Sequence, residues 1–237
     1  MSGSHTPDHQ PRPFVDLLVS IVAPSLILMK LSGDEHLGSV NALLLALALP
    51  LGWGLFELVK YRKKNFIAVL GMVSVGLTGG IGLLELDAGY LAIKEAAIPA
   101  IIGLAVLIST QTRYPLVRTL LYNPNVLNVA KIHTALEKNN STAEFEGRLQ
   151  KASYFFAGTF LFSSIMNYVL AKWIVVSPSG TEAFNEELGR MTLLSYPVIA
   201  IPSMVMMMLI FYYLWRTIRR LTGFTLEEAL APHLAEK

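Results

Sequence analysis

The stretch "LTGGIGLLELDAGYLAIKEA", from Leu77 to Ala96, decides the fold that this sequence predicts. It ends a glycine-rich apolar run, turns over two acidic residues, and enters a second apolar run that carries Lys94 and Glu95. A transmembrane helix needs about 20 residues, so the second run can span a bilayer only if it begins near Ala88. With a rise of about 1.5 Å per residue, Lys94 then lies about 9 Å below the start of that helix. We therefore expect two membrane-spanning helices joined by a tight turn, with charge inside the second.

The whole chain has the composition of a membrane protein. Of its 237 residues, 53% are hydrophobic and 15% are charged, whereas a soluble domain usually carries about 25% charged residues. The net charge of +2 is too small to predict nucleic-acid binding. The chain has no cysteine, which excludes disulfides, thiolate metal ligands and a thiol nucleophile. The five histidines are scattered, so we expect no metal site, and we expect no cofactor.

Six apolar runs are long enough to cross a bilayer. They cover residues 14–31, 40–59, 66–85, 89–110, 152–176 and 192–215. The loops between them alternate between acidic and basic, and most of the 19 lysines and arginines fall on one side. The positive-inside rule assigns that side to the cytoplasm. The sequence therefore predicts an all-α, polytopic membrane protein with six transmembrane helices and both termini cytoplasmic.

These runs divide the chain into five predicted segments. They are a disordered cytoplasmic tail (1–13), transmembrane helices 1–4 (14–110), a cytoplasmic juxtamembrane segment (111–151), transmembrane helices 5 and 6 (152–215), and a cytoplasmic C-terminal tail (216–237). Apolar residues at helical spacing in 125–138 predict a short amphipathic helix at the membrane surface. Near the C-terminus, Thr225 followed by Glu228 predicts the start of another helix.

Basic residues at the predicted cytoplasmic ends are expected to contact lipid headgroups. The candidate contacts are Lys60, Arg62, Lys63, Lys64, Arg113, Arg118, Arg216, Arg219 and Arg220. Such contacts are common to many membrane proteins, so they indicate membrane lipids as partners without specifying one lipid.

The polar residues around the opening stretch are the main candidates for a site. They are Thr78, Gly79, Gly80, Glu85, Asp87, Lys94 and Glu95. A charge inside a membrane helix is costly unless it is paired or reaches the interface. In one interpretation, Lys94 pairs with Asp87 or Glu85 and locks the outer ends of two helices together. In the other, Lys94 contacts an anion in a polar pocket that opens outward.

Neighbouring helical positions differ by about 100°. We therefore expect Glu95 to face away from Lys94, toward Lys30 or Lys172 on other helices.

Three further patterns lie inside the predicted spans. Thr159, Ser163 and Asn167 follow one another at four-residue spacing, so this stripe either forms interhelical hydrogen bonds or lines a pathway. Gly76 and Gly80 form a GxxxG motif, which favours close helix packing. Alternatively, the "TGG" of residues 78–80 is a weak point in the helix that exposes backbone to a polar cavity. Prolines predict kinks in spans one, two, four and six, at Pro24, Pro50, Pro99, Pro197 and Pro202.

Residues 74–109, "SVGLTGGIGLLELDAGYLAIKEAAIPAIIGLAVLIS", lie between "ELVKYRKKNFIAVLG" and "TRYPLVRTLLYN". Together they resemble a family of small, mostly uncharacterised proteobacterial inner-membrane proteins, some of which are loosely labelled transporters. This resemblance covers residues 40–122. A fainter resemblance, to the intracellular septation protein A family, is limited to 74–109.

The resemblances imply a bacterial inner-membrane protein of the cell envelope, and they carry over no active site. The positions that match are Thr78, Gly79, Gly80, Asp87, Lys94 and Glu95.

Three classes of function remain open. The first, which we favour, is a non-enzymatic envelope protein that binds lipids, other envelope proteins or a second copy of itself. The second is a small transporter or lipid translocator with an outward-facing polar pocket around Lys94 and Glu95. The third is a membrane enzyme acting on lipid, which would depend on Glu85, Asp87 and Glu95, although no residue is assigned as catalytic. The sequence names no small-molecule ligand.

Overall fold

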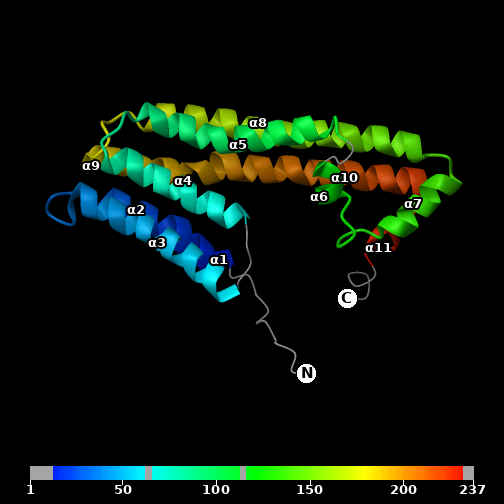
Figure 1. The fold of residues 1–237 in the computed structure, drawn as a ribbon, viewed down its shortest axis with the longest axis horizontal. Helices are drawn as coiled ribbons and strands as arrows, with labels where there is room; N and C mark the ends of the chain where they lie inside the picture. The colour runs from blue at the N-terminus through cyan, green and yellow to red at the C-terminus, as the bar shows by residue number, and fades with distance from the viewer. Residues whose placement is uncertain (1–12, 62–65, 113–115, 232–237) are drawn as a thin grey trace, which may run out of the picture. The chain divides into compact units, whose positions relative to one another are not determined.

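The computed structural model describes residues 13–61, 66–112 and 116–231 (Figure 1). Residues 1–12 of the predicted tail lie outside the described residues. So do four of the predicted headgroup contacts, Arg62, Lys63, Lys64 and Arg113, together with the side chain of Lys60.

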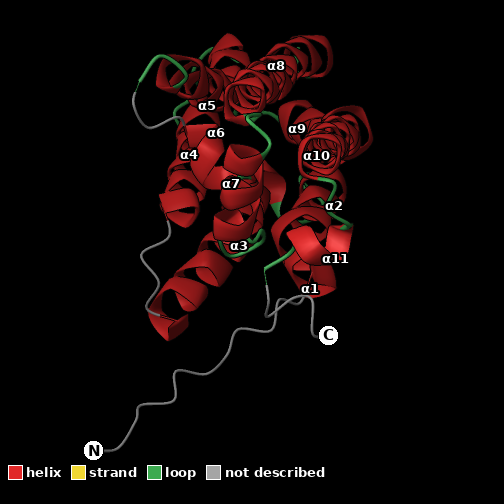
Figure 2. Ribbon diagram, turned by 90° about the vertical axis from the view of Figure 1, so that its right-hand side faces the viewer, coloured by secondary structure: helices red, strands yellow, loops and turns green. Residues whose placement is uncertain are grey.

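The described chain is built of helices and turns, with one isolated β-bridge between Leu127 and Leu230 (Figure 2). In chain order the elements are α1 (Pro13–Leu17), the π-helical turn η1 (Leu18–Val22), α2 (Ala23–Leu31), α3 (Gly38–Tyr61), α4 (Phe66–Leu83), α5 (Gly89–Ser109), α6 (Leu116–Leu121), α7 (Val129–Lys138), α8 (Thr142–Ile174), α9 (Glu182–Ser195), the π-helical turn η2 (Tyr196–Ala200), α10 (Ile201–Thr222) and α11 (Leu226–Ala229). The prediction of an all-α chain is confirmed for these residues.

Five helical segments of the described chain are long and apolar enough to cross a membrane. They are Phe14–Leu31, Gly38–Phe56, Gly89–Ser109, Thr142–Ile174 and Glu182–Thr222. The remaining predicted span, 66–85, corresponds to α4, whose apolar part among the described residues is the shorter Leu70–Leu83. The coarse prediction, a helical chain with several helices of membrane-spanning length, is therefore confirmed.

Two helices begin well before the predicted spans that they contain. Helix α8 begins at Thr142 rather than at 152, because Phe145 and Leu149 bury one face of a segment that is otherwise polar. Helix α9 begins at Glu182, inside a stretch that we expected to be an acidic loop. The Thr181 side chain accepts a hydrogen bond from the backbone N–H of Phe184 and caps this helix. Average hydropathy misses such amphipathic turns because it does not register which face is buried.

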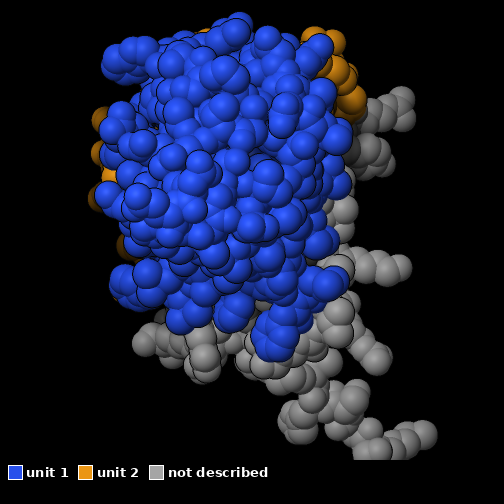
Figure 3. All heavy atoms as spheres, turned by 90° about the vertical axis from the view of Figure 1, so that its left-hand side faces the viewer, with its two compact units in different colours: residues 1–96, 166–198 blue, residues 97–165, 199–237 orange. Residues whose placement is uncertain are grey.

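The chain forms two compact units (Figure 3). Unit 1 contains residues 1–96 and 166–198, and unit 2 contains residues 97–165 and 199–237. The division passes through the interior of α5 and α8. The boundaries between predicted segments at 151/152 and 215/216 also fall inside helices, namely α8 and α10.

In unit 1, helices α2 and α9 approach closely at Gly189. A Cβ atom built there would lie 2.7 Å from the carbonyl oxygen of Ser25 on α2, so only glycine fits without movement of the backbone. The neighbouring Asn185 is 1% exposed, and its amide nitrogen donates to the Ser32 hydroxyl at 3.1 Å and to the Ser39 carbonyl at 2.7 Å. These bonds connect α9 to the end of α2 and the start of α3.

The glycines of α4 form part of a packing seam in unit 1. Cβ atoms built at Gly79 and Gly82 would lie 2.7 Å and 2.5 Å from the side chains of Leu47 and Leu43 on α3. Gly76, in contrast, has no atom within 4 Å of its built Cβ. Helix α4 thus packs against α3 at Gly79 and Gly82. The two glycines of the GxxxG motif, Gly76 and Gly80, do not take part in this contact.

In unit 2, both predicted surface helices are present. Helix α7 is amphipathic and is capped by the Asn128 side chain, which accepts from the Lys131 backbone N–H. Helix α11 begins with the predicted capping box of Thr225 and Glu228. Burial among these elements raises the pKa of the Tyr122 phenol to about 12.

Three of the predicted proline kinks coincide with changes in helix type, and one of them, Pro197, lies inside the π-helical turn η2. The π-helical turn η1 directly precedes Pro24 in the first turn of α2, and η2 directly precedes Pro202 in the first turn of α10. Proline lacks the N–H that would bond four residues back, and a wider π-turn accommodates this loss. Pro50 and Pro99, in contrast, lie inside α3 and α5, which continue through them.

Candidate functional site

Lys94 lies in unit 1 among oxygen atoms that use all three of its donors. Its ammonium nitrogen is 2.6 Å from the Glu95 carboxylate and 2.7 Å from the Thr78 hydroxyl. It also lies 3.2 Å from the Ser74 hydroxyl and 3.4 Å from the Ser74 carbonyl oxygen. A lysine ammonium has three N–H donors, so these three residues satisfy it. The Lys94 side chain is only 8% exposed.

The prediction for the direction of Glu95 is wrong. Glu95 does not face Lys30 or Lys172, because it forms the ion pair with its own neighbour, Lys94. The 100° offset separates the Cβ directions of adjacent residues. The long side chains of lysine and glutamate bring their charged ends back together, where the buried ammonium gains most from a carboxylate.

Asp87 and Glu85 are not within ion-pair distance of Lys94, contrary to the pairing that we considered. Asp87 instead accepts a hydrogen bond of 2.6 Å from the Gly89 backbone N–H and caps the start of α5. The two acids therefore belong to the turn between α4 and α5 and not to the Lys94 cluster.

Three of the predicted residues on α4 have different surroundings. Thr78 is buried, accepts from Lys94, and donates to the Ser74 carbonyl at 3.1 Å. Gly79 faces α3, whereas Gly80 has no atom within 4 Å of a built Cβ. Ser74, which was not among the predicted site residues, could have been found from its four-residue spacing to Thr78 on the same helix face.

The turn at Glu85 and Asp87 lines a separate hollow of about 540 Å³ in unit 1. Its other wall is formed by Lys172 at the end of α8 and by the segment 175–179 that follows. Glu85 adopts the left-handed conformation, with φ of 51°, and its side chain lies against Gly180, where a Cβ would be 2.8 Å away. The structure thus brings both acids and a lysine to one cavity that excludes the Lys94 cluster.

The three residues of the predicted stripe all lie on α8. The Thr159 hydroxyl donates to the Phe156 carbonyl of its own helix at 2.7 Å. The hydroxyl of Ser163 lies 3.0 Å from that of Ser203 on α10, which is an interhelical hydrogen bond of the expected kind within unit 2. Asn167 belongs to unit 1.

The predicted headgroup contacts that lie in the described part of unit 2 fall into two groups. Arg118 forms an exposed ion pair with Glu146 at 3.0 Å. Arg216, Arg219 and Arg220 are exposed at the end of α10 and line a hollow of about 430 Å³ with Tyr212 and Trp215. The hollow thus combines three arginines with a tyrosine and a tryptophan, residue types that are enriched where membrane proteins meet lipid headgroups.

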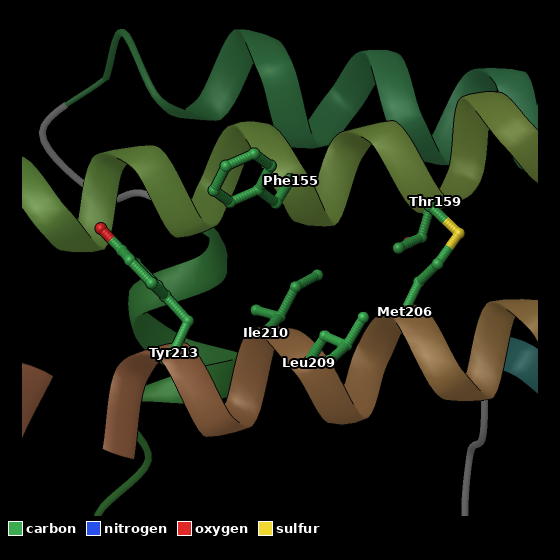
Figure 4. Close-up of a pocket in the computed structure, with 6 residues that line it drawn as sticks. All are labelled: Phe155, Thr159, Met206, Leu209, Ile210 and Tyr213. Atoms are coloured by element: carbon green, nitrogen blue, oxygen red, sulfur yellow. The ribbon is translucent and has the colours of Figure 1, made fainter. Parts of the chain in front are cut away.

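An apolar groove of about 290 Å³ lies between α8 and α10 in unit 2. Figure 4 shows Phe155 and Thr159 on α8 facing four residues of α10. Those four residues are Met206, Leu209, Ile210 and Tyr213. The sequence does not predict this groove, because apolar residues in a helix of membrane-spanning length do not reveal where two helices leave a gap.

The described residues contain no group of three or more histidine and acidic side chains that could hold a metal ion. The chain matches no protein-family model, no curated protein and no solved structure. Its function therefore has to be proposed from the geometry of the described residues.

Proposed function

We propose that the chain is a non-enzymatic integral membrane protein of the bacterial inner membrane that acts by binding membrane lipid or protein partners. The observation that carries this proposal is the exposure of large apolar side chains along helices of membrane-spanning length. On α10 alone, Ile201, Met204 and Leu209 are each more than half exposed. Such surface is stable against lipid and not against water. The resemblance to inner-membrane protein families supports the bacterial location.

The closed surroundings of Lys94 support a structural role for it over a ligand contact. An ammonium that already donates to Glu95, Thr78 and Ser74 has no donor left for a substrate anion. This favours a binding protein over a transporter whose pocket is centred on Lys94.

We further propose six spans with both termini cytoplasmic, in which α4 crosses the membrane in spite of its short apolar part. The alternating acidic and basic loops support this orientation. Because the chain has no cysteine, a single introduced cysteine is its only thiol and reports the side on which it lies.

Labelling with a membrane-impermeant maleimide tests this topology at three exposed positions. Glu35→Cys and Glu186→Cys are expected to react in intact cells, and Lys138→Cys only after permeabilisation. Three proposed spans separate Glu35 from Lys138, so these residues lie on opposite sides only if α4 crosses. Reaction of Glu35→Cys and Lys138→Cys from the same side would refute the six-span arrangement.

A second candidate function is a small transporter, which the hollow lined by Glu85, Asp87 and Lys172 favours. The hydroxyl of Ser179 beside this hollow is buried and has no hydrogen-bond partner among the described residues. A cavity with both charge signs suits a zwitterionic solute.

Complementation of a strain that lacks the gene separates the two candidates in one envelope-stress assay. Binding by the three arginines of α10 predicts loss of function in Arg216→Gln/Arg220→Gln and normal function in Lys172→Gln. Transport through the hollow predicts the reverse, and that result would move the transporter to first place.

A further inference from the structure

The groove and the arginines of unit 2 lie on one continuous face of α10. Leu209, Tyr213, Arg216 and Arg220 are spaced by four, three and four residues, which places them on the same side of a helix. Leu209 and Tyr213 line the apolar groove, and Arg216 and Arg220 line the basic hollow. The face therefore changes from apolar to cationic along the helix.

The groove is open at its sides. Leu209 is 61% exposed and Phe155 is 56% exposed, while Ile210 at the floor is 4% exposed. Apart from the Thr159 hydroxyl, which already donates within its own helix, and the phenol of Tyr213 at one end, its lining is hydrocarbon and thioether (Figure 4). An elongated apolar chain can enter such a groove without burying an unpaired polar group.

The arginines at the end of this face lack acidic partners. In the part of the chain that the structure describes, no carboxylate lies within 4.0 Å of Arg216, Arg219 or Arg220, although Arg118 and Arg148 both have one. The guanidinium group matches phosphate in a bidentate geometry, and each arginine retains its donors for such a ligand.

We propose that this face of unit 2 binds one anionic phospholipid, with its phosphate at Arg216 and Arg220 and one acyl chain in the groove between α8 and α10. The proposal rests on the proposed function, in that the chain must be embedded in a membrane. Met206 and Arg216 lie about 15 Å apart along the helix axis. This distance equals the depth of one hydrocarbon leaflet in a bilayer about 30 Å thick. Both the charge and the length of the face thus fit a lipid that stands in one leaflet.

Native mass spectrometry of the full chain in detergent tests the proposal. The protein is titrated with phosphatidylglycerol and, separately, with phosphatidylcholine that carries the same acyl chains. We expect the first bound lipid to prefer phosphatidylglycerol. In the variant Arg216→Gln/Arg220→Gln, the apparent Kd for phosphatidylglycerol should rise about tenfold or more, as expected when charge-assisted hydrogen bonds are lost.

Two pairs of variants separate the headgroup contact from the groove. Lys138→Gln/Arg190→Gln removes the same charge from exposed positions elsewhere and should leave the preference unchanged. Leu209→Trp should fill the groove and weaken the binding of both lipids. Met208→Trp, at the adjacent exposed position of the same helix, should leave the binding of both lipids unchanged. These sites are exposed, so the variants should fold, and thermal unfolding checks that they do. Free glycerol phosphate should not compete, because it has no acyl chain.

Equal affinity for the two lipids, or an unchanged Kd in Arg216→Gln/Arg220→Gln, would overturn the proposal. A dimer that disappears in Leu209→Trp but not on lipid addition would overturn it as well, because a second copy would then occupy the face. Extraction with alkaline carbonate distinguishes a failure of the proposed function from a failure of this inference alone. A chain that leaves the membrane contradicts the proposed function, whereas a chain that stays and shows no lipid preference contradicts only this inference.

Discussion

Lys94 shows how one residue can constrain the packing of two helices in unit 1. Its charge would be costly inside a membrane helix, yet it is 8% exposed and saturated by Glu95 and by two hydroxyl-bearing residues of α4. A buried ion pair contributes little net stability relative to apolar residues, but it penalises any arrangement that separates the partners. Lys94 therefore selects the register of α5 against α4 more than it stabilises the fold.

Removal of the lysine alone should be strongly destabilising. We expect Lys94→Met to lower the free energy of unfolding by about 3 kcal/mol, because Glu95 keeps a partly buried charge without a partner. Equilibrium unfolding in mixed micelles with sodium dodecyl sulfate measures the change.

The matched variants decide how the loss arises. Lys94→Met/Glu95→Leu should recover most of the lost stability, and Lys30→Met, at an exposed lysine, should change little. If the double variant were as unstable as the single one, the contacts to Thr78 and Ser74, and not the unpaired carboxylate, would explain the loss.

At the scale of elements, close helix approach depends on which face a glycine occupies. Gly189 and Gly76 both lie inside helices, but only Gly189 touches another backbone. Glycine is less favourable than alanine in a helix interior, so a glycine without a close neighbour only costs stability. The two positions make a matched pair for one experiment.

Alanine should have opposite effects at these two positions. We expect Gly189→Ala to destabilise unit 1 by about 1–3 kcal/mol, since the new methyl group must push α2 away from α9. Gly76→Ala should be neutral or stabilising by about 0.5–1 kcal/mol. Thermal unfolding of the two variants in one detergent measures both, and equal effects would contradict the packing assigned to α2 and α9.

Helix α11 should be sensitive to acid. Hydrogen bonds from Thr225, first from its backbone N–H and then from its hydroxyl, lower the pKa of the Glu228 carboxyl below its usual value of 4.5, with a weaker effect from Lys131. Because the folded pKa is lowered, this contribution to stability is present above pH 4.5 and is lost as the pH falls through the folded pKa.

Hydrogen exchange of the Ala229 amide, which bonds to the Thr225 carbonyl, reports this loss. At neutral pH the wild-type protein should protect this amide better than Glu228→Gln does, and the difference should vanish at acid pH. Comparison at equal pH removes the intrinsic pH dependence of exchange. If the difference between the two proteins persisted at acid pH, the charge of Glu228 would not be the source of the protection.

At the scale of the whole molecule, apolar surface dominates what the chain presents to its surroundings. Each of the five helical segments of membrane-spanning length carries large apolar side chains that the rest of the described chain leaves exposed. We expect the full chain to remain in the membrane pellet after alkaline carbonate extraction and to aggregate when detergent is removed. Recovery in the soluble fraction would contradict a membrane location.

The sequence by itself determined the helical class, the presence of several helices of membrane-spanning length and the two short helices α7 and α11. Hydrophobic run length, helical periodicity and capping are local properties that each segment carries alone. The sequence also identified Lys94 as a charge that needs a partner, because it lies in an apolar run, where burying an unpaired charge costs free energy.

Only the tertiary structure decided which atoms meet. The contacts of Lys94 with Ser74 and Thr78 on α4, the α2–α9 contact at Gly189 and the groove beside Leu209 all depend on which helix faces which. Residues that are far apart in the chain satisfy these contacts, and apolar helices can pack in many rotations of similar hydrophobic energy. Close backbone approach and buried hydrogen bonds then select one rotation among them.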